Sequence, residues 1–374
     1  MEEEKLLDIE EIPDDIKHSP YSYICDFVEK LYPSTGKEVF EILSLVPISL
    51  IIPDLSYFSK TERTNMNVLF LAYSGSGKSS ICKLFSKFCY YPLEGRSYTP
   101  AELENKTLKY MHEFGMFSLI IEDYATMSTD ERINKIIEGV LGDEKVIDRH
   151  TTKKDIRESI EAVGLLAGVP DDLSNKITSG TLSRVLCVLI VHDDDKHSSI
   201  GKHISDNLGI LNGATEKEKI IKSYYQALYE IQNNKINEYG KVVEFVIPES
   251  MREQIYKAWD GRTRIYRKQV PFNFFRELQD AYRILVSHCF LNYFNRKVKD
   301  GKMYVNQEDC QIALNLLKRN LDTKYYLFIS EKMSKSIRSA VQLNNVINRI
   351  SNERAKNTIK QLMPIHLKNL KKST

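Results

Sequence analysis

Residues 72 to 79, which read AYSGSGKS, have the composition of a phosphate-binding loop. In such a loop, glycines let backbone N–H groups turn toward phosphate oxygens, a lysine contacts the β and γ phosphates, and a hydroxyl group ligates Mg²⁺. The stretch therefore predicts that the chain binds ATP and Mg²⁺. The residues expected to contact this cofactor are Ser74, Gly75, Ser76, Gly77, Lys78, Ser79 and Ser80. The Ser79 hydroxyl is also the expected metal ligand.

The segments on either side of the loop support this interpretation. The apolar run 68–71 leads into it, and Ile81, Leu84 and Phe85 follow on one helical face. A glycine-serine turn followed by a lysine also occurs in proteins that bind no nucleotide, and Ala72 stands where the general pattern has a glycine. The strand before the loop and the helix after it favour the nucleotide site.

Two adjacent acids, Glu122 and Asp123, follow the apolar run 117–121 and predict the second half of the site. Hydrolysis of ATP needs one carboxylate in the shell of the Mg²⁺ ion and another that orients or activates the attacking water. We expect Glu122 to join Ser79 as a metal ligand and both acids to be catalytic. The alternative is an acidic turn after a buried strand, which a preceding phosphate-binding loop makes weaker.

Four continuous apolar runs are expected to position these residues. They cover 68–71, 117–121, 162–167 and 185–191. A strand that helices cover on both faces has this pattern, so the runs predict a mainly parallel sheet whose carboxyl ends line a ligand site. After about residue 205 helical spacing dominates, with one helix around residues 275–290 and another that Asn306 caps. The expected fold class is α/β, a parallel-sheet P-loop core followed by an α-helical lid domain and a basic helical tail.

Composition and charge limit the class of protein. The 374 residues are 42% hydrophobic and 28% charged, typical of a globular protein rather than a disordered or membrane protein. The six cysteines lack zinc-ligand spacing and predict reduced packing residues in the cytoplasm. Residues 1–17 hold eight acids and two bases, whereas residues 331–374 hold ten bases and two acids. The carboxyl-terminal end is thus the one expected to attract polyanions.

Over roughly residues 20 to 325 the sequence resembles the minichromosome maintenance (MCM) helicases of the AAA+ class. The stretch IIEDYATMSTDERINKIIEGVLGDEKVIDRHTTKKDI is similar to the MCM segment from the second ATPase motif to the pre-sensor hairpin. AVGLLAGVPDDL looks like the sensor-1 strand, TLSRVLCVLIVHDDDKHSSIGKHI like the arginine-finger segment, and VPFNFFRELQDAYRILVSHC like the sensor-2 helix. The order and spacing of these segments carry the resemblance. It implies a lone AAA+ core without the N-terminal zinc and OB-fold domain.

The resemblance implies roles for two arginines. Arg184 would be the finger that reaches the γ phosphate of a neighbouring subunit, and Arg276 the sensor-2 arginine of the lid. A finger acting in trans implies a ring, in this family most often a hexamer. Arg184 can alternatively pair with surface acids, and Arg283 competes with Arg276 for the lid position. The basic cluster Arg262, Arg264 and Arg267 is expected to form a solvated or DNA-facing surface.

Two departures from the family pattern bear on the rate of hydrolysis. The family has aspartate then glutamate at the second motif, whereas this chain has Glu122 then Asp123. Sensor 1 of the family offers an asparagine to the attacking water, whereas the matching residues 167–170 are Ala-Gly-Val-Pro. Asp171 or Asp172 can substitute, or the sensor is lost. Slow hydrolysis is therefore an expectation as well.

The hairpin that the resemblance implies has basic residues at its tip, and DNA phosphates are their expected ligand. These are Arg149, His150, Lys153 and Lys154. An ordinary solvated turn is the alternative. The expected divisions of the chain are an acidic mobile N-terminus (1–19), the ATPase core (20–210), the lid (211–325) and a basic extension (326–374).

Two functions follow. The first is an ATP-dependent DNA translocase or helicase that forms a ring on single-stranded or forked DNA and replicates a small genome, such as that of a virus or plasmid. The second is an ATP-dependent initiator or loader that binds DNA, oligomerises and unwinds little. The altered sensor 1 and the order of the acids favour the second function, and the finger and hairpin favour the first. Both fit a cytoplasmic protein of a prokaryote or of a virus-infected cell.

Overall fold

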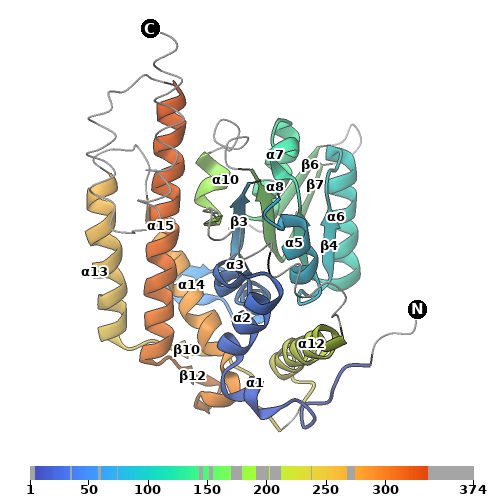
Figure 1. The fold of residues 1–374 in the computed structure, drawn as a ribbon, viewed down its shortest axis with the longest axis vertical. Coiled ribbons are helices and arrows are strands. Elements are labelled where there is room, and N and C mark those ends of the chain that lie inside the picture. The colour runs from blue at the N-terminus through green and yellow to red at the C-terminus, as the bar shows by residue number, and fades with distance from the viewer. Residues whose placement is uncertain are drawn as a thin grey trace.

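A five-stranded parallel sheet forms the centre of the molecule (Figure 1). The structure is a computed structural model that describes residues 5–33, 36–57, 60–73, 75–142, 146–150, 155–169, 179–190, 202, 212–236, 238–267 and 274–335. The strand order is β4-β5-β8-β3-β9. Their bounds are β3 (Asn67–Ala72), β4 (Pro92–Gly95), β5 (Phe117–Ile121), β8 (Ala162–Gly168) and β9 (Leu186–Ile190).

The four predicted strands are confirmed as β3, β5, β8 and β9. Every residue of β3, β5 and β8 is buried, which explains why their sequences are apolar without alternation. Helices of the same region follow and cover the strands: α5 (Lys78–Ser86), α6 (Pro100–Phe114), α7 (Tyr124–Met127), α8 (Glu131–Val140) and α10 (Ser179–Ser183). The edge strand β4 was not predicted, because its sequence PLEG is short and mixed in polarity.

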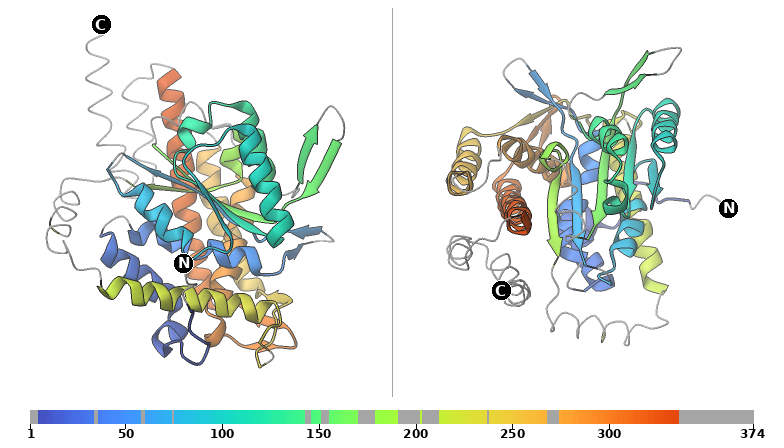
Figure 2. Two further views of the ribbon diagram at one scale, coloured as in Figure 1. Left: turned by 90° about the vertical axis from the view of Figure 1, so that its right-hand side faces the viewer. Right: turned by 90° about the horizontal axis from the view of Figure 1, so that it is seen from above.

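Two antiparallel hairpins extend from this core. One consists of β1 (Leu55–Tyr57) and β2 (Lys60–Glu62), the other of β6 (Val146–His150) and β7 (Asp155–Ser159). The second is the hairpin that the resemblance implies, and Figure 2 shows it projecting away from the sheet. Its tip, residues 151–154, lies outside the described residues.

The region after residue 211 is mainly helical. It contains α12 (Asn212–Gln232), α13 (Glu249–Tyr266), α14 (Phe275–Leu291), the short 3₁₀ helix η1 (Tyr293–Asn295) and α15 (Gln307–Lys335). The predicted cap is confirmed, since Asn306 accepts from the Asp309 N–H and Asp309 accepts from the Asn306 N–H. Helical spacing dominates the sequence of this region and did not indicate the short strands that it also contains. A small sheet of β10 (Glu244–Val246), β12 (Lys302–Tyr304) and β11 (Val298–Lys299) lies at the base of the helices.

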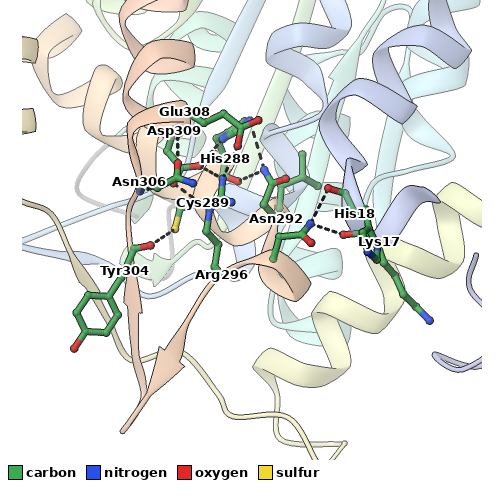
Figure 3. A network of polar contacts seen from close by, with 12 residues as sticks. Lys17, His18, His288, Cys289, Asn292, Arg296, Tyr304, Asn306, Glu308 and Asp309 are labelled. Atoms are coloured by element: carbon green, nitrogen blue, oxygen red, sulfur yellow. Dashed lines mark hydrogen bonds and ion pairs between the residues drawn. The ribbon is translucent and has the colours of Figure 1, made fainter. Parts of the chain in front are cut away.

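A buried polar network joins α14 to the start of α15 (Figure 3). His288 Nδ1 lies 2.6 Å from Asp309 Oδ1, and Arg296 Nη2 lies 2.7 Å from the same oxygen. Burial opposes the charge of Asp309, but the hydrogen bonds from His288 and Arg296 outweigh it and lower the pKa of its carboxyl. The network also reaches the N-terminal region, because the Asn295 amide donates to the Lys17 and His18 carbonyls.

The acidic N-terminal segment packs on this helical region, so the prediction that it is mobile was wrong for the described residues. Ile9, Ile12 and Ile16 are buried, and the Leu7 N–H donates to the Ser223 hydroxyl of α12. The next residues form α1 (Asp14–His18), α2 (Pro20–Leu31), α3 (Gly36–Leu43) and α4 (Val46–Ile51). Pro47 lies at the start of α4, which makes α4 a helix separate from α3.

The helices and the sheet share one apolar core. Helix α15 contacts β9, α13 and α14, and the expected division between lid and extension at 325/326 falls inside this single helix. Residues 336–374, which carry most of the basic tail, lie outside the described residues. Within the described ranges, no helix combines the length and the apolar composition needed to cross a bilayer.

Candidate nucleotide site

The glycine-rich stretch connects β3 to α5 at the carboxyl edge of the sheet. Gly75 has φ +83° and Gly77 has φ +77°, a conformation that residues with a Cβ rarely adopt. A Cβ at either position would meet no atom within 4 Å, so the backbone angle rather than crowding requires glycine. Ser74 lies outside the described residues.

Lys78 begins α5 and folds over the loop. Its ammonium donates to the Ala72 carbonyl at 2.6 Å and to the Tyr73 carbonyl at 3.0 Å. The Ser76 hydroxyl donates to the same Tyr73 carbonyl at 2.6 Å. Residues 78–80 form the first turn of α5, so Ser79 and Ser80 lie where unpaired N–H groups and the helix dipole favour an anion. The loop has the backbone and charge of a phosphate site.

Glu122 lies on the same edge of the sheet as the loop, at the end of β5. Glu122 and Lys78 both influence the pKa of Cys82 of α5. Burial, together with the Glu122 and Glu94 carboxylates, raises the pKa of the Cys82 thiol to about 12, while the Lys78 ammonium acts in the opposite direction. Cys82 therefore lies within electrostatic range of both groups. Lys78 and Glu122 follow β3 and β5, the strands on either side of β8, at the same edge of the sheet.

Glu122 has a cationic partner that the sequence did not indicate. Arg96 Nε lies 3.2 Å from Glu122 Oε2, and the Glu122 N–H donates to the Gly95 carbonyl at 3.1 Å. The Glu122 side chain is 12% exposed and the Arg96 side chain 75% exposed. Arg96 directly follows the unpredicted strand β4, so the missing strand concealed this residue. A lone basic residue after a short edge strand carries no signal by itself.

Asp123 has a local role. Its Oδ1 accepts from the Thr126 N–H at 3.3 Å and its Oδ2 from the Thr126 hydroxyl at 2.7 Å, which caps α7. Its side chain is exposed. Glu122 and Asp123, adjacent in sequence, therefore differ in surroundings. Glu122 is largely covered and faces a cation, whereas both oxygens of Asp123 hold a helix start.

Strand β8, which resembles a sensor-1 strand, lies between the strand of the loop and the strand of the acids. β3 pairs with β8 and β8 pairs with β5, all parallel. The end of β8 at Gly168 therefore emerges between Lys78 and Glu122. Asp171 and Asp172, the candidates to replace the missing asparagine, lie outside the described residues.

Arg184 lies at the opposite edge of the sheet. It precedes β9, whose first residue Leu186 pairs with Val68 near the start of β3. The length of the six-residue β3, about 20 Å, separates Arg184 from the loop. The Arg184 Nη1 donates to the Gly180 carbonyl at 2.8 Å, and its Nε is buried with no hydrogen-bond partner among the described residues. It does not join the nucleotide site of its own chain.

The arginines of the lid separate into distinct roles. Arg283 is buried, donates to the Arg63 carbonyl at 2.8 Å and pairs with Asp280 at 2.9 Å, so it is a packing residue. Arg276 lies in the first turn of α14 and is partly exposed. Arg262 pairs with the buried Asp322 at 2.7 Å, which corrects the expectation that the cluster 262–267 is solvated throughout.

The expected DNA hairpin is held at both roots by Arg63. The Arg63 guanidinium donates to the Gly142 carbonyl just before β6, and at 2.9 Å to the Ile160 carbonyl just after β7. Arg149 and His150 are the last residues of β6 and pair with Ile156 and Asp155.

Lys153 and Lys154 lie in the tip, outside the described residues. The structure thus contains the hairpin as a backbone element.

The residues of the loop and β5 suit a magnesium nucleotide better than a bare metal ion. Within the described ranges, no group of three or more His, Cys, Asp or Glu residues could hold a metal. Mg²⁺ bound to a nucleotide needs only one or two protein oxygens beside the phosphates, and Ser79 with Glu122 would supply that number. No protein-family model and no curated protein matches the chain.

Proposed function

We propose that the chain is an ATP-dependent DNA translocase or helicase of AAA+ type, similar to the MCM helicases, that works as a ring. The observation that carries the proposal is the shared edge of Lys78 and Glu122. A glycine loop with a lysine ends β3, a largely covered carboxylate ends β5, and β8 lies between them. This arrangement brings a phosphate cradle and an acid to one place on a rigid sheet.

ATP and Mg²⁺ would be held by groups of the loop and of β5. The Lys78 ammonium would exchange the Ala72 and Tyr73 carbonyls for phosphate oxygens, with little motion because it already lies over the loop. The Ser79 hydroxyl and the Glu122 carboxylate would face the metal, which would neutralise phosphate charge. Glu122 would have to leave Arg96 to do so.

The place of Arg184 is compatible with a ring. A guanidinium stabilises the negative charge of phosphoryl transfer, but this one is about 20 Å from its own loop. Head-to-tail packing of identical subunits would bring the amino edge of one sheet to the carboxyl edge of the next, and such packing forms a ring when the rotation between subunits closes. The resemblance to MCM makes six the expected number of subunits.

The hairpin β6–β7 would contact DNA. It projects from the sheet, and its sequence carries Arg149, His150, Lys153 and Lys154 around the turn. Such residues contact phosphates without reading sequence. Arg63 would keep the hairpin fixed to the ATPase core, because its guanidinium binds both roots.

A second candidate function is an initiator or loader that uses ATP to oligomerise and unwinds little. Three observations favour it: the Glu122 carboxylate is paired with Arg96, both Asp123 oxygens cap α7, and β8 ends without a polar side chain at Ala167 or Gly168. All three would slow hydrolysis.

Strand displacement on a forked duplex with ATP separates the two functions, with the oligomer size measured beside it. The translocase displaces the strand, and its ATP hydrolysis rises with single-stranded DNA. Lys78→Ala abolishes both activities. Hydrolysis without displacement by an assembled ring supports the loader, and no ATP binding by the wild-type chain overturns both functions.

The hairpin is tested by replacing Arg149, Lys153 and Lys154 together with glutamine. We expect this variant to keep basal ATP hydrolysis and to lose its stimulation by DNA, because phosphate contacts contribute most of nonspecific affinity. The Lys106→Gln variant, on the outer helix α6, is the control for a change of surface charge. Equal stimulation of the hairpin variant and the wild type contradicts a role of the hairpin in DNA binding.

A further inference from the structure

Three aromatic rings and one guanidinium form a cluster on the outer helices, away from the sheet. Tyr256, Trp259 and Arg267 lie on or directly after α13, and Phe275 begins α14. The Tyr256 and Trp259 ring centroids are 5.9 Å apart, and those of Trp259 and Phe275 are 5.7 Å apart and stacked. The Arg267 guanidinium lies 5.1 Å from the Trp259 ring and 5.9 Å from the Phe275 ring. We call these four residues the aromatic–arginine cluster.

Local contacts fix the geometry of this cluster. The Trp259 indole N–H donates to the Phe274 carbonyl at 2.7 Å, which holds the start of α14 against α13. The Arg267 Nη2 donates to the Thr263 hydroxyl at 2.8 Å, one turn earlier on α13, and this bond orients the guanidinium over the rings. A planar cation held over ring faces is a favourable arrangement. The cluster is thus organised before any partner binds.

The cluster is open to solvent at both ends. Tyr256 is 51% exposed and Phe275 is 56% exposed, whereas Trp259 between them is buried. Figure 1 shows α13 at the outer side of the molecule, beside α15. Large aromatic rings that are exposed together on a rigid surface are typical of a binding site, because rings that serve only packing are normally buried.

The charge around the cluster is positive. On α13 and at its end, the exposed cations are Arg252, Lys257, Arg264 and Arg267, and the exposed acids are Glu249 and Glu253. Two of these cations form ion pairs, Lys257 with Glu253 and Arg264 with Asp260. Arg252 and Arg267, which are also exposed, supply further positive charge, and Arg267 lies directly over the rings. This combination of cations and aromatic faces suits a polyanion that also offers flat rings.

We propose that the aromatic–arginine cluster is a stacking site for single-stranded DNA, separate from the hairpin. Unpaired bases would stack on the exposed faces of Tyr256 and Phe275, while Arg267 and its neighbours contact the phosphates. Duplex DNA buries its base faces and fits the surface poorly. The proposal rests on the proposed function, since it assumes that the chain works on DNA. It adds a second contact for the single strand on the outer helices.

Trp259 gives a direct readout, because it is the only tryptophan of the chain. An oligothymidylate of about 20 nucleotides, added to the full chain without nucleotide, is expected to change the Trp259 fluorescence saturably, whereas a duplex of that length changes it far less. Affinities are measured by anisotropy of the labelled oligomer. Phe275→Ala and Arg267→Gln each weaken binding about tenfold, or about 1.4 kcal/mol.

Tyr304 provides a matched control, since it is a 40% exposed aromatic with the Lys297 ammonium 5.8 Å from its ring, on the small sheet. Tyr304→Ala should bind the oligomer as the wild type does. Equal loss in Tyr304→Ala and Phe275→Ala, or wild-type affinity in Phe275→Ala and Tyr256→Ala, overturns the proposal. So does a change of oligomer size in these variants with unchanged DNA affinity, because the surface would then bind protein.

The outcome separates this proposal from the ATPase proposal. Lys78→Ala should retain the fluorescence change, since the loop lies on the sheet and the cluster lies on the outer helices. An inactive ATPase that binds the oligomer through Phe275 removes the proposed function and keeps the stacking site. An active, DNA-stimulated ATPase whose affinity does not depend on Phe275 removes only the stacking site.

Discussion

The guanidinium of Arg96, at the end of β4, lies 3.2 Å from the Glu122 carboxylate at the end of β5. One partner is exposed and the other largely covered, and both lie on the edge of the sheet that carries the glycine loop. An ion pair of this kind contributes little stability. The ion pair matters instead for the Glu122 carboxylate, which would have to leave Arg96 before it could bind Mg²⁺.

Arg96→Ala is expected to raise basal ATP hydrolysis about two- to fivefold, the equivalent of an exposed ion pair of about 0.5–1 kcal/mol. The free energy of unfolding should change by less than about 0.5 kcal/mol, since the Arg96 side chain is 75% exposed. Steady-state hydrolysis and urea unfolding measure the two effects. Arg132→Ala, which removes a similar exposed arginine paired with Asp130, is the control. A lower hydrolysis rate in Arg96→Ala would assign the arginine to the phosphates instead.

Glu122→Gln and Asp123→Asn distinguish the two acids. Glu122→Gln should lower kcat about 100-fold or more and leave ATP binding intact, because the amide can neither activate water nor bind Mg²⁺ well. Asp123→Asn should lower kcat less than about tenfold and keep the unfolding midpoint, because asparagine also caps helices. Single-turnover hydrolysis and thermal unfolding are the measurements. A loss in Asp123→Asn as large as that in Glu122→Gln would place water activation on Asp123.

Arg184→Ala and Lys78→Ala are each expected to lose ATP hydrolysis, and an equal mixture should regain part of it. In a ring of random composition, about a quarter of the sites join an intact loop from one variant to an intact Arg184 from the other. Hydrolysis measured across mixing ratios should therefore pass through a maximum.

Mixing Arg184→Ala with a chain that carries both substitutions is the control, because no finger is then supplied. A mixture that stays inactive at every ratio would falsify the role of Arg184 in trans.

Asp309→Asn is expected to destabilise the lid by about 3 kcal/mol at pH 7. The substitution removes the buried carboxylate that His288 and Arg296 share. The pKa of Asp309 is lower in the folded chain, so the unfolded state binds the proton first as the pH falls. The stabilisation is complete above about pH 4 and is lost below it. Urea unfolding at pH 7 and pH 3 should show a smaller pH dependence in Asp309→Asn than in the wild type.

Glu308→Gln is the control for this change, since Glu308 pairs with the same Arg296 from the surface, at 3.1 Å. It should cost less than about 1 kcal/mol at pH 7. An Asp309→Asn chain that unfolds at the wild-type urea concentration would show that the network does not stabilise the lid.

The strands of the sheet and the glycine loop could be predicted because their signals are local. β3, β5 and β8 are buried along their whole length and β9 at all residues except Leu189, so each reads as a continuous apolar run. Gly75 and Gly77 occupy positions that only glycine adopts easily. The cap of α15 was also visible, since it depends on residues close in sequence, whereas the hairpin β6–β7 was expected from the resemblance alone.

The strands that the sequence did not predict are too short to show an alternating pattern of apolar and polar residues. β4 has four residues, and β10, β11 and β12 have two or three each, so no alternation develops. The N-terminal segment was judged by its acids, although Ile9, Ile12 and Ile16 recur at helical intervals and are buried. There the apolar spacing outweighs the charge, because α12 covers it.

The amino-acid sequence alone predicted the strands and the residues that follow them, Lys78 and Ser79 after β3 and Glu122 and Asp123 after β5, because each strand is a local apolar run and parallel strands end at one edge. Only the tertiary structure decided where the arginines lie and which groups they contact. Strand pairing put Arg184 on the far edge, a four-residue strand brought Arg96 to Glu122, and helix packing buried Arg283. Arg96 lies far from Glu122 in sequence and Arg283 far from Arg63, and contacts of that kind are set by which strands and helices pack together.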